Sequence, residues 1–548
     1  MTEFLVPAAC ISTLAQPADF YQLLLSRCQQ ASARVTLSSL YLGTGLLEQA
    51  LLSALHARLL AAPEVRAVLH FDLGRTLRRT GAEGGGAGAY ASSAALLLEL
   101  LNGGDAGRSS SLAERARIDL TQLPALRGAL GAVAAPRVSE ALGVWHAKAY
   151  VFDHHTAILT GANLSTDYFT TRQDRYVVVS SSGGAGGAAG ERAVRSFVDY
   201  LHATFDSLGS IPGGYRLHSD GTVRAVGAAV GVGAAAPPPA PHPSPPIQRI
   251  PLPFFSPLHS SYARELQRIL RAASSPTPMG SLPPAASPTS QDSAELVALR
   301  PRWQLGSLGV RCDEAALTAL LRTALPPAPA ASLHLATGYF NLPTALQALI
   351  IGPPGTSTCI HALTASPLAN GFWGAAGIAG AVPLAYCQLE RVFYRAAEGA
   401  GRLMEDPEGQ PRAPGIAIHE YERAGWTFHA KGLWLAAHGE GGNGECMTSL
   451  VGSSNFGMRG THRDLELQVE MCTRAPAAVA ALRRERDALF TQPHVRAVGG
   501  HLSASLGYGR ERNVFSAAVT PHRALLWRRA WANGVWIHAG FRILKPFF

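Results

Sequence analysis

The sequence predicts an α/β fold made of two similar halves. Strand-like and helix-like runs alternate through residues 1–212 and again through 303–500, which is typical of α/β proteins. A His-x-Lys motif occurs once in each half, at 146–148 and at 429–431. A Pro/Ala/Ser-rich stretch separates the halves. We therefore expect two α/β sandwich halves related by a pseudo-twofold, with one composite active site between them.

The elements of the first half follow from its apolar periodicity. Phe20, Leu24 and Cys28 recur at helical spacing after Pro17, which predicts a helix over 18–32. The same reasoning predicts helices over 46–60 and 191–208, and strands over 35–42, 65–71, 148–152, 156–159 and 175–180. Residues 72–79 and 82–93 are expected to be loops.

The second half repeats this order. A helix over 313–325 leads to a strand over 332–336, and a closing helix over 477–490 corresponds to the one over 191–208. The remaining strands are expected over 359–364, 415–421, the second motif, 446–451 and 465–472.

Four segments follow from this division of the chain. They are a first half (1–212), a linker (213–302), a second half (303–500) and a basic aromatic tail (501–548). The linker is expected to be disordered, apart from a helix over 262–272, because its Pro/Ala/Ser-rich parts bury too little apolar surface. The tail combines Trp and Phe with Arg and Lys, which favours either a membrane surface or packing on the second half.

Composition narrows the class of function. The net charge of +9 favours an anionic partner, whether nucleic acid, anionic lipid or a phosphate-rich substrate. Seven scattered cysteines predict reduced thiols in an intracellular protein. We find neither a signal peptide, nor an Arg-rich transit peptide, nor 18 consecutive apolar residues.

The two His-x-Lys motifs carry matched polar residues downstream. Residues i and i+2 share a face of a strand, so each His and Lys should point to one side. Asn163 follows His146, and Asn455 follows His429 at a spacing lengthened by a Gly-rich loop over 437–445. A carboxylate then follows each Asn at an identical spacing, at Asp174 and Glu466. A lone His-x-Lys is weak evidence, but two copies with the same companions indicate a site.

This set of residues suits chemistry on a phosphodiester. The Lys and Asn side chains donate hydrogen bonds to non-bridging oxygens, where charge develops. One imidazole attacks phosphorus to form a phosphohistidine, and the other acts as acid and then base. Each carboxylate would hold a ring nitrogen and fix its tautomer. We favour His146 as nucleophile because only its motif is followed by an Asp, Asp153, although the pattern alone leaves the choice open.

The first motif, His146-x-Lys148-x4-Asp153, resembles the HxKxxxxD signature of the phospholipase D superfamily. The second departs from it, because Ala436 stands where the Asp would be. Within that superfamily the chain resembles the eukaryotic CDP-diacylglycerol–glycerol-3-phosphate 3-phosphatidyltransferases. The segments that carry this closer resemblance are 39–45, 161–165, 172–176, 426–434 and 463–466.

The resemblance implies a reaction and a place. A phosphatidyl group passes from CDP-diacylglycerol to sn-glycerol 3-phosphate through a covalent intermediate, which releases CMP and makes phosphatidylglycerophosphate for phosphatidylglycerol and cardiolipin synthesis. No cofactor is needed, although a divalent cation could accompany the nucleotide. The resemblance also implies a mitochondrial enzyme, peripheral on the inner membrane, with no nucleic-acid partner. It leaves the oligomeric state open.

The candidate site residues fall into three groups. We expect catalytic roles for His146, Lys148, Asp153, His429 and Lys431. Supporting roles are expected for Asn163, Asp174, Ser453, Asn455 and Glu466, and substrate contacts for Arg75, Tyr168, Arg172 and Arg175.

Three of these assignments have a second interpretation. Asp153 could bond only local backbone and Lys148, and Arg175 could simply pair with Asp174. Ser453 has no hydroxyl counterpart in the first half, where Gly161 stands.

Two alternative functions stay open. The chain could be another enzyme of the same superfamily: a phosphatidylserine synthase, a cardiolipin synthase or a nuclease. It could also be a non-catalytic protein that binds lipid or nucleic acid, although the survival of both motifs with both carboxylates argues against this.

Overall fold

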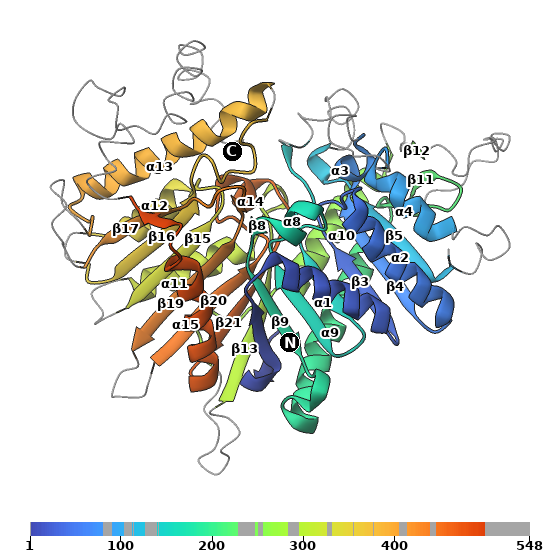
Figure 1. The fold of residues 1–548 in the computed structure, drawn as a ribbon, viewed down its shortest axis with the longest axis horizontal. Helices are drawn as coiled ribbons and strands as arrows, with labels where there is room; N and C mark the ends of the chain where they lie inside the picture. The colour runs from blue at the N-terminus through green and yellow to red at the C-terminus, as the bar shows by residue number, and fades with distance from the viewer. Residues whose placement is uncertain are drawn as a thin grey trace.

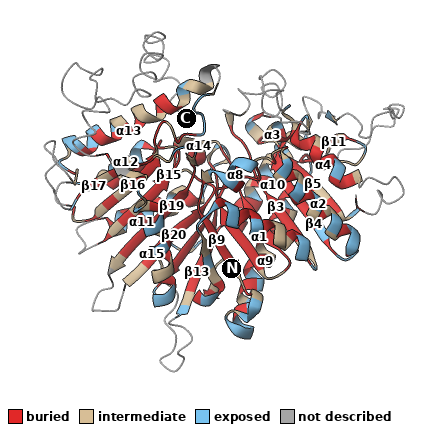
Figure 2. Ribbon diagram, viewed as in Figure 1, coloured by how far each residue is buried: buried red, intermediate tan, exposed pale blue. Residues whose placement is uncertain are grey.

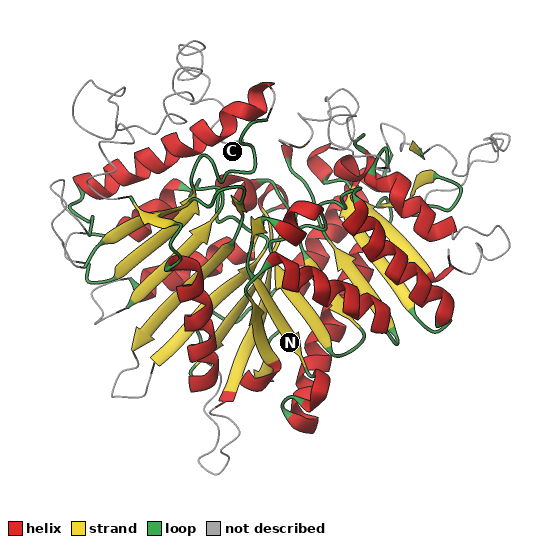
Figure 3. Cartoon of the chain, viewed as in Figure 1, coloured by secondary structure: helices red, strands yellow, loops and turns green. Residues whose placement is uncertain are grey.

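Two large β-sheets stand side by side in the computed structural model, and helices pack on their faces (Figures 1 and 3). The structure describes residues 2–79, 90–102, 112, 114–126, 140, 142–227, 247–249, 256–282, 295–325, 331–353, 356–375, 377–404, 414–438 and 445–498. The tail expected at 501–548 therefore lies outside the described residues.

The first sheet has the order β12-β11-β10-β5-β4-β3-β6-β7-β9-β2. Its strands β3, β4 and β5 are parallel, whereas β6, β7, β9 and β2 follow antiparallel. The strands are β2 (Ile11–Leu14), β3 (Arg34–Ser38), β4 (Arg66–Asp72), β5 (Ala116–Thr121), β6 (Ala149–Phe152), β7 (Thr156–Thr160), β9 (Tyr176–Ser180), β10 (Tyr215–Leu217), β11 (Thr222–Ala225) and β12 (Gln248–Arg249).

The second sheet has the order β1-β13-β21-β20-β19-β15-β16-β17-β22, with β14 paired to β13. Here β15, β16 and β17 are parallel, and β19, β20, β21 and β13 follow antiparallel. The strands are β1 (Phe4–Pro7), β13 (Leu296–Leu305), β14 (Val310–Arg311), β15 (Ser332–Thr337), β16 (Cys359–Ala365), β17 (Ile416–Tyr421), β19 (Lys431–His438), β20 (Glu445–Gly452), β21 (Glu466–Thr473) and β22 (Val495–Ala497).

Helices pack on both sheets, and α9 also lies at the joint between the halves. Among the described residues they are α1 (Pro17–Gln30), α2 (Leu46–Ala61), α3 (Leu73–Leu77), α4 (Ser93–Asn102), α8 (Thr166–Thr170), α9 (Gly187–Gly209), α10 (Leu258–Ala273), α11 (Cys312–Ala324), α12 (Thr344–Ile351), α13 (Val382–Gly399), α14 (Met458–His462) and α15 (Pro476–Phe490). The helices and strands expected from periodicity are confirmed, with ends that differ by a few residues. Figure 2 shows the strands buried and the exposed residues mainly on outer helix faces.

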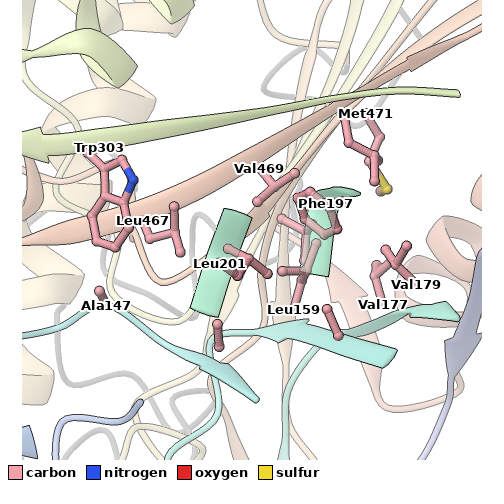
Figure 4. Close-up of a cluster of buried hydrophobic side chains, with 14 of the residues drawn as sticks. Ala147, Leu159, Val177, Val179, Phe197, Leu201, Trp303, Leu467, Val469 and Met471 are labelled. Carbon is pink, nitrogen blue, oxygen red and sulfur yellow. The ribbon is translucent and has the colours of Figure 1, made fainter. Parts of the chain in front are cut away.

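A shared hydrophobic cluster joins the two halves. It buries side chains from β7, β9 and α9 of the first half against β13 and β21 of the second (Figure 4). The residues labelled there are Ala147, Leu159, Val177, Val179, Phe197, Leu201, Trp303, Leu467, Val469 and Met471. Burial of this kind is worth about 1.5–3 kcal/mol for each large side chain, so the joint is part of the core.

Backbone pairing also crosses between the halves. Strand β1, at the start of the chain, pairs with β13 in the second sheet, while β2 belongs to the first sheet. The short strands β8 (Arg172–Gln173) and β18 (Thr427–Phe428) pair in parallel, and Trp145 forms a bridge with Leu465. These connections hold the two motifs beside each other.

The expectation of a disordered linker over 213–302 is wrong for much of that range. Strands β10 and β11 extend the first sheet, helix α10 packs beside β13, and β13 itself begins at Leu296. The stretch 274–282 is also held, because the guanidinium of Arg302 donates to the carbonyls of Ser275 and Thr277. The prediction missed these short apolar segments because it rested on the Pro/Ala/Ser-rich composition of the range. The Pro-rich part at 234–246 lies outside the described residues.

Two other expectations need correction. The loop expected over 72–79 contains helix α3, capped by the Asp72 side chain, which accepts from the Arg75 amide. Within the loop expected over 82–93, residues 82–89 are not described, and Ser93 starts α4. In the described part of the chain, no helix combines the length and apolar character that a membrane crossing requires.

Candidate active site

The two motif histidines are each held by a carboxylate from the other half. Nδ1 of His146, just before β6, lies 2.9 Å from both carboxylate oxygens of Glu466, the first residue of β21. Nδ1 of His429, just before β19, lies 2.6 Å from Oδ2 of Asp174, between β8 and β9. The matched spacing predicted a carboxylate for each imidazole but not this crossing. Each histidine–carboxylate pair therefore requires residues from both halves.

The two imidazoles differ at Nε2. The Tyr168 hydroxyl, on the short helix α8, lies 3.1 Å from Nε2 of His429 and accepts a hydrogen bond from Nδ2 of Asn163. No described residue forms a hydrogen bond with Nε2 of His146, whose side chain keeps 11% of its surface exposed, against 5% for His429. Nε2 of His146 is therefore more accessible than Nε2 of His429.

Both motif lysines are buried beside their histidines. The Lys148 ammonium donates to the carbonyl oxygen of His146 at 2.8 Å. Lys431 donates in the same way to the carbonyl of His429 and also lies 2.7 Å from its Nδ1. The lysines are each 1% exposed, so their remaining donors are available only to a group that enters the site.

Burial sets the protonation of the site. It lowers the pKa of both imidazoles well below the usual value, so the resting histidines are neutral. It lowers the pKa of Lys148 to about 7 and of Lys431 to about 8. It raises the pKa of Asp174 to about 6 and of Glu466 to about 7, against the opposing pull of the lysines. Such perturbation in a buried cluster is typical of a functional site.

The two asparagines do not occupy equivalent places. Asn163 is 2% exposed, and its Oδ1 accepts from the Ser39 hydroxyl and the Leu40 amide. Its Nδ2 is used by Tyr168, so Asn163 positions that hydroxyl. Among the described residues, the buried Oδ1 of Asn455 has no hydrogen-bond partner. An unpaired buried amide oxygen is costly, which is consistent with a role toward a bound substrate.

Ser453 and its counterpart Gly161 differ for steric reasons. The Ser453 hydroxyl donates to Glu466 and also accepts from the Leu467 amide, so it fixes the carboxylate that holds His146. At Gly161 a Cβ would stand 2.8 Å from Cδ of Lys431 and 3.0 Å from Asp174. The first half therefore has no room for a serine at this position.

The expected catalytic role of Asp153 is not supported by its position. It lies at the far end of β6 from Lys148, five residues or roughly 16 Å along an extended chain. Its carboxylate accepts from the backbone amides of residues 32, 33 and 34 and from the Ser32 hydroxyl. A hydrogen bond from His155, together with these donors, holds the pKa of Asp153 well below the usual value. Asp153 thus fastens the turn between α1 and β3, and its presence does not identify the nucleophile.

The expectation that Arg175 contacts substrate is wrong. Its side chain is fully buried in the second half, where Nε and Nη2 form a bidentate pair with Glu485 at 2.7 and 2.8 Å. The guanidinium also bonds the Leu450 carbonyl and lies over the Trp434 ring. The alternative pairing with Asp174 is limited to the Arg175 backbone amide.

The other two arginines lie over tyrosine rings. Arg172 lies over the Tyr168 ring, 4.7 Å from its centroid, and pairs with Asp167. Arg75 lies over the Tyr41 ring and pairs with Glu140. Both guanidiniums are partly exposed, so their expected contacts with substrate stay predictions.

Sequence reasoning missed several neighbours of the site. The Tyr339 ring lies edge-on to His429 at 5.7 Å, and Arg459 pairs with Asp464, whose carboxylate also accepts from the Val144 amide. Asp464 sits within a segment noted for its resemblance, which was the available signal. The described residues contain no group of three or more His, Cys, Asp or Glu side chains arranged to hold a metal.

Comparison with known proteins places the chain in a family. It is 33% identical to the mitochondrial CDP-diacylglycerol–glycerol-3-phosphate 3-phosphatidyltransferase of Cricetulus griseus, over 90% of this chain and 80% of the relative. The Homo sapiens enzyme is also 33% identical (90% and 79%), and the Saccharomyces cerevisiae enzyme is 27% identical (90% and 84%). No family model matches the chain.

The fold is that of a solved phosphatidylserine synthase from Haemophilus influenzae Rd KW20. The TM-score is 0.65 at 16% identity, over 100% of this chain and 97% of the other. At that identity the likeness concerns the fold alone, whereas the relatives above share about a third of their residues over most of their length. The chain belongs to the CDP-diacylglycerol–glycerol-3-phosphate 3-phosphatidyltransferase family.

Proposed function

We propose that this chain transfers a phosphatidyl group from CDP-diacylglycerol to sn-glycerol 3-phosphate, giving phosphatidylglycerophosphate and CMP. Family membership supports the two substrates, because the relatives' names specify them. The single structural observation that carries the proposal is the crossed pairing of His146 with Glu466 and of His429 with Asp174. It brings two neutral imidazoles and two lysines into one buried centre suited to phosphoryl-group chemistry.

The two halves act as pseudo-twofold partners around one composite site. Both sheets have the same sequence of parallel and antiparallel neighbours, which runs outward from β3 in one and from β15 in the other. The crossed pairs follow naturally from such a relation. Two independent sites would instead keep each His with a carboxylate of its own half.

His146 attacks phosphorus in this scheme. A nucleophile needs an unprotonated Nε2 with free access, and Nε2 of His146 has no described partner while Nε2 of His429 faces the Tyr168 hydroxyl. The Nδ1–H of His146 donates to Glu466, which fixes the ring proton on Nδ1 and stabilises the charge that develops on the ring. Asp153 does not bear on the choice of nucleophile, because its carboxylate bonds backbone amides.

His429 is the acid and then the base. A bound pyrophosphate brings negative charge, which raises the pKa of this imidazole and favours its protonated form. It then protonates the CMP leaving group, the P–O bond to CMP breaks, and a phosphatidyl–His146 bond remains. In the second step His429 takes the proton of the glycerol 3-phosphate hydroxyl as that oxygen attacks phosphorus, and the P–N bond to His146 breaks to release the product. Lys148 and Lys431 donate to the non-bridging oxygens throughout.

The relatives are named as mitochondrial, which supports a mitochondrial location for this chain. We propose that it lies peripherally on the inner membrane. The proposed steps use only protein side chains, so no cofactor is required. A divalent cation would at most accompany the pyrophosphate of the donor.

Release of CMP that depends on glycerol 3-phosphate tests the reaction. In a composite site, His146→Ala and His429→Ala should each remove nearly all activity, because attack and leaving-group protonation belong to one displacement. Half of the activity in each variant would contradict the composite site.

Radiolabelled donor separates the roles of the two histidines. The His429→Ala protein should still trap some phosphatidyl-enzyme slowly, because CMP is a tolerable leaving group, and the His146→Ala protein should trap none. The opposite pattern would exchange the two roles. A panel of glycerol 3-phosphate, serine and phosphatidylglycerol as acceptors distinguishes this activity from that of a phosphatidylserine or cardiolipin synthase.

A further inference from the structure

Large apolar side chains are exposed near the second motif. In the described part of the chain, the large hydrophobic residues with more than about a third of their surface exposed are Leu46 (73%), Leu60 (37%), Phe372 (39%), Trp373 (37%) and Val392 (53%). We call Leu46, Phe372 and Trp373 the apolar rim. Leu46 comes from the first half and the two aromatic residues from the second. Leu46 begins a helix bonded to α8, and Gly371, just before Phe372, lies close to Arg172, just after α8.

Phe372 and Trp373 lie in a loop held against the second motif. The Ala369 carbonyl accepts from the amide of Phe428, the residue before His429. The Phe372 ring lies 6.0 Å from the Tyr339 ring, which lies 5.7 Å from the His429 ring. The Phe372 ring is thus presented within two ring contacts of the catalytic centre, on a loop whose backbone is hydrogen-bonded.

Leu46 reaches the same region from the first half. It is the first residue of α2, and the Glu48 carboxylate in the same turn bonds the Thr166 hydroxyl at the start of α8. Tyr168 of α8 contacts Nε2 of His429, and Arg172 just after it lies close to Gly371. Helix α8 therefore lies between Leu46 and the two aromatic residues Phe372 and Trp373. Figure 1 shows α8 at the edge where the two sheets meet.

We propose that the apolar rim is where the enzyme enters the surface of a phospholipid bilayer. This inference rests on the proposed function, because a diacyl donor keeps its chains in the bilayer while its phosphate must reach His146 and His429. Aromatic side chains favour the headgroup boundary, and surface-bound segments enter it by about 5–10 Å. The rim residue Phe372 lies two ring contacts from His429, which meets this requirement, since the phosphate itself lies in the headgroup layer.

Vesicle binding of full-length variants tests the rim. Trp373→Glu and Leu46→Glu should each weaken flotation with phosphatidylcholine vesicles that contain phosphatidylglycerol by about tenfold, because each places a charge where an apolar group enters the boundary. Leu60→Glu is the matched control. It lies at the other end of α2, 14 residues or about 21 Å from Leu46, and should bind as the unchanged protein does.

Turnover separates the inference from the proposed function. With a short-chain CDP-diacylglycerol below its micelle concentration, the rim variants should release CMP within about twofold of the unchanged protein. With a long-chain donor in vesicles, their rates should fall as their binding does.

Equal vesicle binding by all variants, or equal loss with Leu60→Glu, overturns the rim. A dimer that becomes a monomer on Trp373→Glu, with vesicle binding unchanged, would overturn it in favour of a second copy. If neither the unchanged protein nor any variant turned over the donor, while the rim variants still bound vesicles more weakly, only the proposed function would be contradicted.

Discussion

At the scale of single residues, the partner of each carboxylate depends on which end of a strand the carboxylate occupies. Glu466 and Asp174 stand at strand starts that face the opposite motif, and each holds the Nδ1 of the other half's histidine. Asp153 stands at the far end of its strand and holds backbone instead. Carboxylates thus differ in what they hold: two of them bond the motif imidazoles, and the third bonds backbone amides.

Glu466→Gln should lower kcat by about 10²- to 10⁴-fold while the fold is kept. A glutamine amide can donate to Nδ1 and so favours the wrong tautomer of His146, with no charge to stabilise the imidazolium. Steady-state kinetics and the rate of label trapping measure the effect.

Asp153→Asn is the contrasting variant. It should keep kcat within a few-fold but lose roughly 2–3 kcal/mol of unfolding free energy, because amides of residues 32–34 lose a charged acceptor. Chemical denaturation measures this loss. If Asp153→Asn impaired kcat as severely as Glu466→Gln, the assignment of Asp153 to stability would be wrong.

The lysines predict how activity falls at alkaline pH. Burial lowers the pKa of Lys148 to about 7 and of Lys431 to about 8, so both ammonium groups are lost as pH rises through that window. Because each must be protonated to stabilise the phosphorane oxygens, kcat/KM should decline between about pH 7 and 8.5. The decline in kcat should come at higher pH, since the bound phosphodiester favours the charged lysines. Parallel profiles that are flat to pH 9 would contradict this.

Much of the residue-level site was predictable, and the rest depended on three-dimensional pairing. Spacing alone related His146, His429, Asp174 and Glu466, because a repeated polar pattern survives in the one-dimensional sequence. It could not show the crossing, since nothing in the spacing says which half supplies the partner. The fate of Arg175 was hidden for the same reason, because its partner Glu485 belongs to the other half of the chain.

At the scale of elements, β9 and α15 are locked together by one ion pair. Arg175 leads into β9 of the first half, and Glu485 lies on α15 of the second. Both are buried, and the guanidinium also lies over Trp434. This pair fastens one half to the other just behind Asp174.

Arg175→Met should cost about 3–5 kcal/mol of unfolding free energy, because it leaves the Glu485 carboxylate buried without its partner. The double variant Arg175→Met with Glu485→Leu should recover most of that loss, since no unpaired charge remains. Denaturation of both single variants and the double variant measures the coupling. If the double variant were less stable than either single one, the pair would not be the source of the effect.

The prediction of elements succeeded where periodicity was long. Helices α1, α9 and α15 and the motif strands followed from apolar spacing. Helix α13 was missed because a Gly/Ala-rich stretch precedes it, although Pro383 at its second position is a known start signal. Strand β1 was missed because it is too short to show a pattern, and its partner β13 belongs to the other half of the chain.

At the scale of the whole molecule, the two halves share part of their hydrophobic core. Separate clusters fill each half, one containing Leu55 and another containing Leu333, while a third cluster spans the joint. Because the joint is buried as thoroughly as either interior, neither half has a complete core without the other.

Thermal unfolding should therefore occur in one transition, with calorimetric and van't Hoff enthalpies that agree. Leu55→Ala and Leu333→Ala lie in different clusters, and each should cost about 2–5 kcal/mol and shift the entire transition. Activity and near-UV circular dichroism should follow the same curve. A variant that shifts only part of the transition would show that the halves unfold separately.

The placement of β1 has a consequence during synthesis of the chain. Residues 4–7 leave the ribosome long before their hydrogen-bond partner β13, which begins at residue 296. At about 5–20 residues per second, the N-terminal strand waits on the order of 15–60 seconds with its edge unpaired. The nascent first half therefore exposes a strand that a chaperone or another nascent chain can capture, and only synthesis of the second half removes that risk.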